Sequence, residues 1–511
     1  MSTISRRTFL GRAAMGAAAA VAFPNILRAQ KTSAARPNVL FLMSDDCRVE
    51  LGCYGSMFHA MTPNLDALAK SGVRFDRNFC QFPLCNPSRA SLLTGRNPTK
   101  TGVLGNRTNF RVLHPDWVSL PELFRQNGYV TVRAGKIFHG GLDDPKAWNR
   151  ATPWTLAQEG GMQSSGIGHV FDTSKIAERS TRDLRSPKFF PPSADESTGR
   201  RRAQYSDRIV LLDGNGEKHG DYHTADHTIA NLQQYKDRPF FIACGFVKPH
   251  SPPTAPVKFF DRYDPGKIRL TPDFASWPTV PPGFPKAAIR PRNADLFIGR
   301  GASRAEAREV IRAYIASISW MDWNVGRVLA ELDRLDLRRN TIIVFLADHG
   351  YQLGEKGKWS KAGSLFEMGT RVPLIISAPG AAGNGRACAR ITQSLDLYPT
   401  LTELCGLPKL PGLEGASFAR LLENPAAVWD KPAFSIWSED GKTIHGTAVR
   451  TARWRYAEYG KNGVNGAMLL DPYNDPLELK NLANQEQYKS VCAGLSTLTR
   501  AYAATLDPAG A

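Results

Sequence analysis

The sequence predicts an α/β fold in which a mostly parallel sheet is covered on both faces by helices and is followed by a smaller antiparallel sheet with one helix. Two observations predict this fold. Three continuous apolar runs each end abruptly in polar residues, and the last part of the chain changes to short strand-like pieces before a terminal helix. With 511 residues, 42% hydrophobic and 22% charged, the chain can bury a large core.

The three apolar runs cover residues 38–43, 238–246 and 341–347. Runs that are apolar on both faces are typical of central strands in a parallel sheet. In open α/β sheets the ligand crevice lies at the carboxyl ends of the strands, so we expect the polar residues that follow the runs to converge there. These residues are Ser44-Asp45-Asp46, Val247-Lys248-Pro249-His250 and Asp348-His349-Gly350.

Helical patterns fall between the strands. Residues 63–68 predict a capped helix that ends at Gly72. Apolar residues at helical intervals predict an amphipathic helix over 311–332 that lies on the sheet. Its buried face is expected to consist of Ile311, Ile315, Ile318, Val325, Leu329 and Leu332.

Two segments rich in Gly, Pro and charge, 160–220 and 249–291, predict long surface loops of the kind that select substrates. After about residue 429 the pieces AFSIWS, GTAVRT, WRYAEYG and AMLLD, with a helix over 485–506, predict a small antiparallel sheet plus helix. We therefore expect a main domain over 30–428 and a smaller α+β subdomain over 429–511.

Residues 1–29 resemble an export signal. Arg6 and Arg7 precede an apolar run from Ala13 to Phe23, and Ala29 is a small residue at which a peptidase would cut. This pattern predicts a twin-arginine signal peptide, the twin-arginine export machinery as a partner, and a periplasmic or extracellular protein. A membrane anchor is the alternative, but the run is about half of the ~20 residues that a spanning helix needs, and no later segment is long enough. We therefore expect no stable membrane insertion.

The formal net charge is +18, and segment 1–29 holds four arginines and no acid, so the rest of the chain carries +14. A positive surplus attracts polyanions. Zinc-finger spacing, a basic heptad region and an aromatic RNA-binding signature are all absent from the sequence, so nucleic acid is not expected as a partner. An acidic polysaccharide or a solvated basic surface fits better.

The eight cysteines lie at 47, 53, 80, 85, 244, 388, 405 and 492, without C-x-x-C pairs or neighbouring histidines. If Cys85 is chemically special, seven remain, and an odd number cannot all pair within the chain. A disulfide scaffold is not expected, although one or two bridges stay open in an oxidising compartment.

Asp45, Asp46 and Asp348 place three carboxylates at the ends of two predicted strands. Like charges so close repel one another unless a cation neutralises them, and oxygen ligands favour a hard ion. The pattern predicts a metal site, with calcium preferred to magnesium because calcium tolerates irregular coordination. His349 is either a ligand or a neighbour of the ligands. The structural alternative is that Asp45 caps a helix and Asp348 accepts hydrogen bonds from a loop.

The stretch CNPSRASLLTGR, residues 85–96, places a cysteine at the start of a short helix-like run. A cysteine in such a position is a candidate nucleophile. A thiolate phosphatase is disfavoured, because its arginine would stand six positions after the cysteine, where this chain has Ser91.

The same stretch resembles the sulfatase signature C-x-P-S-R-x-x-x-L-T-G-R, in which the cysteine is oxidised to formylglycine after synthesis. The resemblance continues through nearly the whole chain after residue 36, in RPNVLFLMSDD, TPNLDALAKSGVRF, GKIFH, KPH, LADHG, KWSKAGSLFEMGTRVPLII, QSLDLYPTLTELCGLP and LLDPYNDPLELKNLA. It is strongest for the iduronate-2-sulfatase branch, since Lys136–His139 reads K-x-x-H and Asp348-His349 replaces an Asp-Asn pair. The resemblance implies an alkaline-phosphatase-like fold.

It also implies a formylglycine-dependent mechanism. Cys85, as formylglycine made by a maturation enzyme, would hydrate to a diol that attacks the sulfur of a sulfated carbohydrate. One Ca²⁺ per chain would be held by Asp45, Asp46, Cys85, Asp348 and His349. Arg89, Lys136 and Lys361 would neutralise the developing charge, His139 would contact the diol, and His250 would protonate the leaving oxygen.

Two other functions stay open at this point. A phosphate or phosphonate ester hydrolase uses a similar fold and carboxylate metal site, but it would want a serine or threonine nucleophile or a second metal with more histidines. A non-catalytic glycan-binding relative would ordinarily lose the cysteine or the metal carboxylates, and this chain retains both. The residues do not identify the sulfated sugar, and they do not distinguish attack at chain ends from attack inside a chain.

Overall fold

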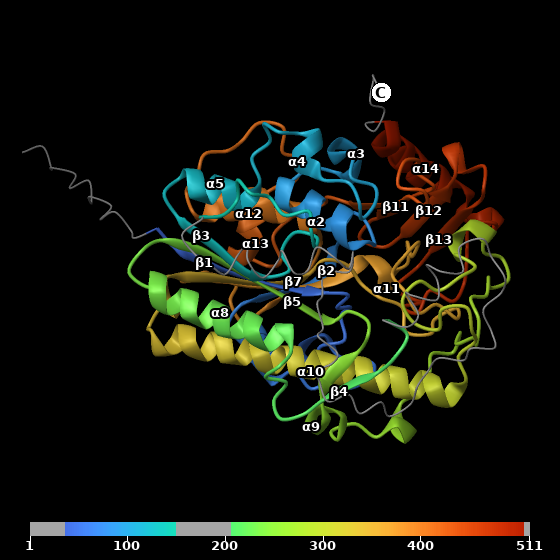
Figure 1. Ribbon diagram of the computed structural model, residues 1–511. Coiled ribbons are helices and arrows are strands. Elements are labelled where there is room, and N and C mark those ends of the chain that lie inside the picture. Colours follow the sequence, from blue (N-terminus) through green and yellow to red (C-terminus); the bar gives the residue numbers. More distant parts are fainter. Residues whose placement is uncertain (1–35, 150–205, 505–511) are drawn as a thin grey trace, which may run out of the picture. The chain divides into compact units, whose positions relative to one another are not determined.

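A computed structural model of the protein describes residues 36–149 and 206–504 (Figure 1). Its main sheet has seven strands in the order β3-β5-β1-β7-β8-β2-β9, and six of them run in one direction while β8 runs in the other. The strands are β1 Asn38–Asp45, β2 Val73–Phe79, β3 Val130–Gly135, β5 Phe240–Pro249, β7 Thr341–Ala347, β8 Arg371–Ser377 and β9 Ala387–Gln393. The predicted mostly parallel sheet is confirmed, and β1, β5 and β7 are the three strands that the apolar runs predicted.

Helices cover both faces of this sheet, and side chains of β1 point alternately to the two faces. Leu40 and Leu42 belong to the core beneath the long helices α8 Gly220–Tyr235 and α10 Arg304–Arg334. Val39 and Phe41 belong to the core on the other face (Figure 1). The helices of that second face are α2 Cys85–Thr94, α5 Leu120–Gln126, α12 Leu397–Leu404 and α13 Ala419–Glu423.

The long helix α10 contains the predicted amphipathic segment 311–332. All six residues of its predicted apolar face are buried. The helix begins earlier than predicted because Ser303 and Glu306 form a capping box, in which each side chain accepts from the other residue's backbone. The predicted helix at 63–68 is α1 Pro63–Lys70, which begins with Pro63 and reaches its C-cap at Ser71.

Shorter helices connect these elements. They are α3 Pro98–Thr101, α4 Phe110–Leu113, α9 Val257–Phe260 and α11 Glu367–Thr370. Within the described residues no helix is long and apolar enough to cross a membrane.

A second sheet follows near the C-terminus, with four antiparallel strands and the helix α14 Lys489–Ala504 against it. The strands are β10 Ala433–Trp437, β11 Gly446–Arg450, β12 Arg455–Tyr459 and β13 Ala467–Leu470. This confirms the predicted small sheet plus helix. The helix starts later than residue 485 because a 3-10 turn, Glu486–Tyr488, precedes it. The domain boundary at residue 429 stays a prediction.

The prediction of surface loops over 160–220 is wrong for residues 209–212, and its first part lies outside the described residues. The loop prediction over 249–291 is likewise wrong for residues 254–260, which form a short buried strand and the helix α9. Val210–Leu212 form the strand β4, which pairs with β6, Thr254–Pro256, and its side chains are buried. The apolar run Ile209-Val210-Leu211-Leu212 explains the difference, since four apolar residues favour burial over exposure.

All eight cysteines are free thiols. No disulfide therefore supports the fold.

Candidate active site

The ends of β1, β5 and β7 meet at one edge of the main sheet. β1 pairs in parallel with both other strands, Ser44 opposite Ala347 and Asp45 opposite Pro249. Asp45 and Asp46 therefore lie beside Asp348, and all three carboxylates are buried. The backbone of Asp46 has a left-handed φ of 62°, which turns the chain sharply after the strand. The predicted convergence of three strand ends is confirmed.

The helix α2 brings Cys85 to this edge. Cys85 is the first residue of the helix, and Leu84 before it is extended. The Cys85 Sγ lies 3.4 Å from Asp45 Oδ1 and 3.3 Å from His349 Nε2. Further along α2, Ser88 Oγ donates a hydrogen bond of 2.5 Å to the Asp348 carbonyl, which anchors the helix to the end of β7.

Arg89, one turn after Cys85, is fully buried behind the thiol. Its Nε donates to Asp348 Oδ2 at 2.8 Å, and its Nη1 donates to the carbonyls of Lys136 and Ile137. Its Nη2 lies 3.8 Å from Asp45 Oδ2. The guanidinium thus fixes the positions of two predicted metal ligands and of the turn that carries Lys136.

Four predicted ligands form a compact group. One ligand atom each from Asp45, Asp46, Cys85 and His349 lies within 4.8 Å of the others. Asp348 lies next to the group, with Oδ2 3.5 Å from His349 Nε2. Its Oδ1 accepts from the backbone N–H of Asp46 and of His349, so the structural interpretation of Asp348 as a loop acceptor also holds.

The chemistry of this group fits a hard divalent cation. Asp46 Oδ1 is buried and has no hydrogen-bond partner among the described residues. Burial raises the pKa of Asp46 to about 7, although Lys361 and His349 oppose the shift. His349 Nδ1 lies 3.0 Å from the Gly350 carbonyl, which can only accept, so its Nε2 is the nitrogen left for a ligand. Asp46 Oδ1 lies 3.3 Å from His349 Nδ1, and a cation would satisfy this carboxylate oxygen.

Two lysines balance the carboxylates. The Lys136 ammonium pairs with Asp45, and Lys361 Nζ lies 2.9 Å from Asp46 Oδ2. Burial opposes the charge of Asp45, but Lys136 and the neighbouring cations outweigh it and hold the pKa of Asp45 well below its usual value. Burial also opposes the charge of Lys361, yet Asp295 and Asp46 raise its pKa well above the usual value. Burial opposes the charge of Lys136 as well, but Asp45 raises its pKa, so both lysines are charged at neutral pH.

Two histidines face the same space. Burial, reinforced by the Lys136 ammonium, holds the pKa of His139 well below its usual value, and its buried Nδ1 has no hydrogen-bond partner among the described residues. His250 Nδ1 lies 2.7 Å from the Ser251 carbonyl, so that nitrogen carries a proton, and His250 Nε2 lies 3.8 Å from Asp46 Oδ2. His139 is thus a neutral base, while His250 can carry a proton on Nε2.

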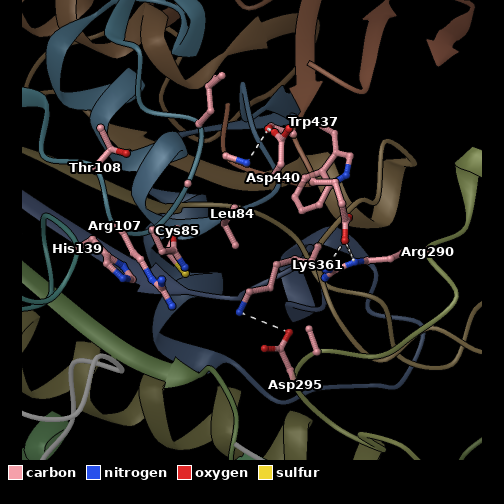
Figure 2. Close-up of a pocket in the computed structure, with 18 of the residues that line it drawn as sticks. Leu84, Cys85, Arg107, Thr108, His139, Arg290, Asp295, Lys361, Trp437 and Asp440 are labelled. Atoms are coloured by element: carbon pink, nitrogen blue, oxygen red, sulfur yellow. Dashed lines mark hydrogen bonds and ion pairs between the residues drawn. The ribbon is translucent and has the colours of Figure 1, made fainter. Parts of the chain in front are cut away.

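A pocket of about 500 Å³ opens above these groups (Figure 2). Its floor consists of the predicted residues Cys85, Lys136, His139, His250 and Lys361. Asp45, Asp46, Arg89, Asp348 and His349 lie behind the floor and do not line it. All ten predicted site residues therefore gather at one place, in two layers. Lys248, which is not among these ten residues, is buried and donates to the carbonyls of His250 and Pro252.

The pocket also includes residues that the sequence did not reveal. Asp295 lies on its wall, with Oδ2 3.6 Å from Lys361 Nζ (Figure 2). Two walls come from the loop 104–108 and from residues 437–442, which are the last residue of β10 in the small sheet and the turn after it. The predicted substrate loop 249–291 contributes Ser251 and Arg290, and Ser206 is the described residue that comes from 160–220. No periodicity or motif marks the two unpredicted walls.

Comparison with known proteins agrees with this geometry. The family model described as "Sulfatase" matches residues 37–407, and the model for the C-terminal part of N-sulphoglucosamine sulphohydrolase matches residues 354–503. The fold is alkaline-phosphatase-like, as predicted. The chain belongs to the sulfatase family, whose members are known to need a metal ion and formylglycine.

Relatives of several specificities resemble the chain. A protein of Formosa agariphila named "Sulfatase" is 32% identical, and the match covers 92% of this chain and 88% of that protein. Human iduronate 2-sulfatase is 31% identical, with 75% and 71% covered. The choline-sulfatase of Rhizobium meliloti is 28% identical, with 88% and 82% covered.

Two solved structures share the fold. One is a protein in complex with its substrate D-glucosamine-2-N,6-O-disulfate, with a TM-score of 0.68, 23% identity, and 93% of this chain and 99% of that chain covered. The other is the phosphonate monoester hydrolase of Agrobacterium radiobacter, with a TM-score of 0.68, 22% identity, and 92% and 96% covered.

Proposed function

We propose that the protein is a sulfuric ester hydrolase that removes sulfate from a sulfated sugar or polysaccharide, with an iduronate-2-sulfatase-like preference. The observation that carries the proposal is the position of Cys85 on the floor of the pocket, with its Sγ 3.4 Å from Asp45 and 3.3 Å from His349. A structural cysteine has no reason to occupy the meeting point of a helix N-terminus, two carboxylates and two lysines.

Cys85 Sγ stands where formylglycine would carry its oxygen atoms. The hydrated aldehyde supplies a nucleophilic oxygen and, unlike serine, lets the bond to sulfate be broken again by loss of a second hydroxyl proton. The neutral imidazole of His139 lines the pocket beside this position, and its Nδ1 has no partner among the residues that the structure describes, so it is a candidate to take up that proton.

Asp45, Asp46, Asp348 and His349 would hold a calcium ion together with the modified residue 85. Such an ion supplies Lewis-acid chemistry toward sulfate oxygens. The protein's own cations would act on the negative charge of the same sulfate oxygens. Lys136 and Lys361 line the pocket, and carboxylates hold both ammonium groups in place before a substrate binds. Preorganised charge of this kind stabilises a transition state without reorganisation cost.

His250 is the candidate acid for the leaving oxygen. The residue lines the pocket, and its Nδ1 contacts the Ser251 carbonyl. The Asp46 carboxylate lies 3.8 Å from Nε2 as an ion-pair partner for the protonated ring. Donation of the Nε2 proton would neutralise the alcohol oxygen as it departs.

The preference for an iduronate-like sugar rests on sequence. Human iduronate 2-sulfatase is 31% identical, and the K-x-x-H spacing of Lys136 and His139 and the Asp348-His349 pair are branch markers. The further proposal of export through the twin-arginine pathway, to the periplasm or beyond, rests on residues 1–29 alone.

The proposal is tested by producing the protein together with a formylglycine-generating enzyme. Mass spectrometry of the tryptic peptide 78–89 should show Cys85 converted and Cys80 unchanged. The protein should release sulfate from para-nitrophenyl sulfate and from a 2-O-sulfated uronic acid, and Cys85→Ala should abolish both activities. Faster turnover of para-nitrophenyl phosphate than of the sulfate would contradict the assignment.

A further inference from the structure

Arg107 is an unpaired cation on the wall of the pocket. Its side chain is exposed, it lines the pocket, and Figure 2 shows it directed inward on the side of Cys85 and His139. Among residues 36–149 and 206–504 no carboxylate or carbonyl forms an ion pair or hydrogen bond with its guanidinium. The other pocket guanidinium differs, because Arg290 Nε donates to Glu439 at 2.8 Å.

The backbone that carries Arg107 is tied to the residue after Cys85. Asn86 Nδ2 donates to the carbonyls of Gly105 at 2.9 Å and Thr108 at 2.8 Å, and the Asn86 backbone N–H donates to Asn106 Oδ1 at 3.1 Å. These three bonds bracket Arg107 on both sides. The guanidinium therefore starts from a backbone that is fixed with respect to position 85.

The nearby acidic residues do not form ion pairs with Arg107. Asp440 lines the pocket, but its Oδ1 accepts from the backbone of Lys442 at 2.8 Å and Thr443 at 2.7 Å, so it shapes its own loop. Glu439 is engaged by Arg290. Lys442 on that loop is a second exposed cation of the pocket, so the mouth has a positive balance.

The cationic side chains of the pocket lie at two depths and therefore define two positions for anionic groups of a substrate. Lys136 and Lys361, which are 8% and 2% exposed, lie at the pocket floor with Cys85, where the sulfate under attack must sit. Arg107 is exposed and belongs to the mouth. A guanidinium presents a planar fork that matches a carboxylate or a sulfate with two parallel hydrogen bonds. A substrate with a single sulfate at the floor would leave this fork without a partner.

We propose that Arg107 is a specificity-determining residue that binds a second anionic group of the substrate, a carboxylate or a further sulfate on the sugar whose first sulfate lies at the floor. This inference rests on the proposed sulfatase function. It narrows the substrate class to sugars with at least two acidic groups, and it assigns Asn86 the task of positioning the Arg107 loop.

The test compares R107Q with the wild-type enzyme on matched substrate pairs. One pair is a 2-O-sulfated uronic acid and its carboxyl-reduced counterpart, and the other is N,6-disulfated glucosamine and its 6-monosulfate. R107Q should lower kcat/KM by roughly tenfold to a hundredfold for the doubly acidic member of a pair, mostly through KM. Its activity on para-nitrophenyl sulfate should stay within about twofold of wild type.

The matched control is R292Q, which removes an arginine of the same charge whose side chain is 69% exposed and which does not line the pocket. It should leave both pairs unaffected. The pair that responds to R107Q identifies the second anion as carboxylate or sulfate. Equal losses on para-nitrophenyl sulfate and on the doubly acidic sugars, or no loss on either pair, would overturn the inference.

A binding measurement separates this inference from the proposed function. Calorimetry with C85A and with the double variant C85A/R107Q, titrated with the same sugars, needs no turnover. Weaker binding of the doubly acidic sugars to the double variant supports the role of Arg107 even if the wild type released no sulfate. Equal affinities of the two variants would reject it even if the wild type is an active sulfatase.

Discussion

Asp46 and Lys361 form a buried ion pair with Nζ 2.9 Å from Oδ2, although 315 residues separate them in the chain. The same ammonium lies 3.6 Å from Asp295 Oδ2. Lys361 thus connects the carboxylates behind the pocket floor with the pocket itself. Its charge stabilises buried acids in the resting protein, and in the proposed reaction it would also face the substrate.

Lys361→Met should therefore lower both stability and activity. It leaves two buried carboxylates without their cation, which we expect to cost about 3–5 kcal/mol of unfolding free energy in urea titrations. It should also reduce kcat/KM for an aryl sulfate by at least about a hundredfold. Lys356→Met is the control, since it breaks a buried pair with Asp273, 2.9 Å away, outside the pocket. Full activity in K361M would contradict the assigned role.

Arg89→Lys should weaken cation binding without removing the charge. A lysine ammonium cannot reach Asp348 and the two carbonyls that the Arg89 guanidinium contacts together. Changes of residues that orient metal ligands typically cost about tenfold to a hundredfold in affinity. Calcium titration by calorimetry measures the effect. Arg111→Lys, which alters another buried arginine, one paired with Asp144 and Glu122 away from the site, should leave calcium affinity unchanged.

Removal of the divalent cation should lower the melting temperature. A cation at one hundred times its Kd stabilises the folded state by about 2.7 kcal/mol, because it binds the folded carboxylate group and not the unfolded chain. Differential scanning calorimetry with EDTA, with Ca²⁺ and with Mg²⁺ checks this. Calcium should restore the transition more fully than magnesium. Equal melting with and without chelator would argue against a metal at Asp45 and Asp46.

Lys358 should make stability depend on pH. Burial and the Arg290 charge lower its pKa to about 7, and its Nζ donates to the carbonyls of Arg290 and Arg292. Above that pKa the folded protein has released this proton, whereas the unfolded chain keeps it up to the usual lysine range. Stability must therefore rise with pH in this window.

Between pH 7 and pH 9 the wild type should gain about 2 kcal/mol of unfolding free energy relative to Lys358→Met. Urea titrations at the two pH values measure the difference. The exposed Lys442→Met variant is the control. Its unfolding free energy should change between the two pH values by the same amount as that of the wild type. A constant difference between the wild type and K358M across these pH values would show that Lys358 stays charged when folded.

Sequence patterns predicted the segments in which apolar residues form a continuous run or a regular period, and the segments that carry a motif. The apolar runs before Asp45, Lys248 and Asp348 predicted three adjacent strands, because full burial on both faces leaves a continuous signal. The motif around Cys85 predicted a helix start at the same edge, and the ten predicted site residues do gather there.

The residues around the pocket mouth escaped prediction for a physical reason. Asp295 stands alone in an irregular loop. Arg107 lies in a loop held by bonds from Asn86, about twenty residues away, and Lys442 lies in a turn whose backbone Asp440 holds. A single functional side chain in an irregular segment leaves no periodic pattern in the sequence. The strand β4 was missed for another reason, since its three residues are too few for alternation to appear.

The wall formed by residues 437–442 has a consequence for how this protein can change. That wall extends from the small antiparallel sheet, whereas the groups clustered around Cys85 come from helix α2 and from the segments that follow strands of the larger sheet. One of the walls that contact the substrate therefore has a different structural support from the groups that cleave the bond, whereas the Arg107 loop is fixed beside Cys85. Evolution or a designer can exchange the turn between β10 and β11 to admit a new sugar while the chemical machinery stays as it is.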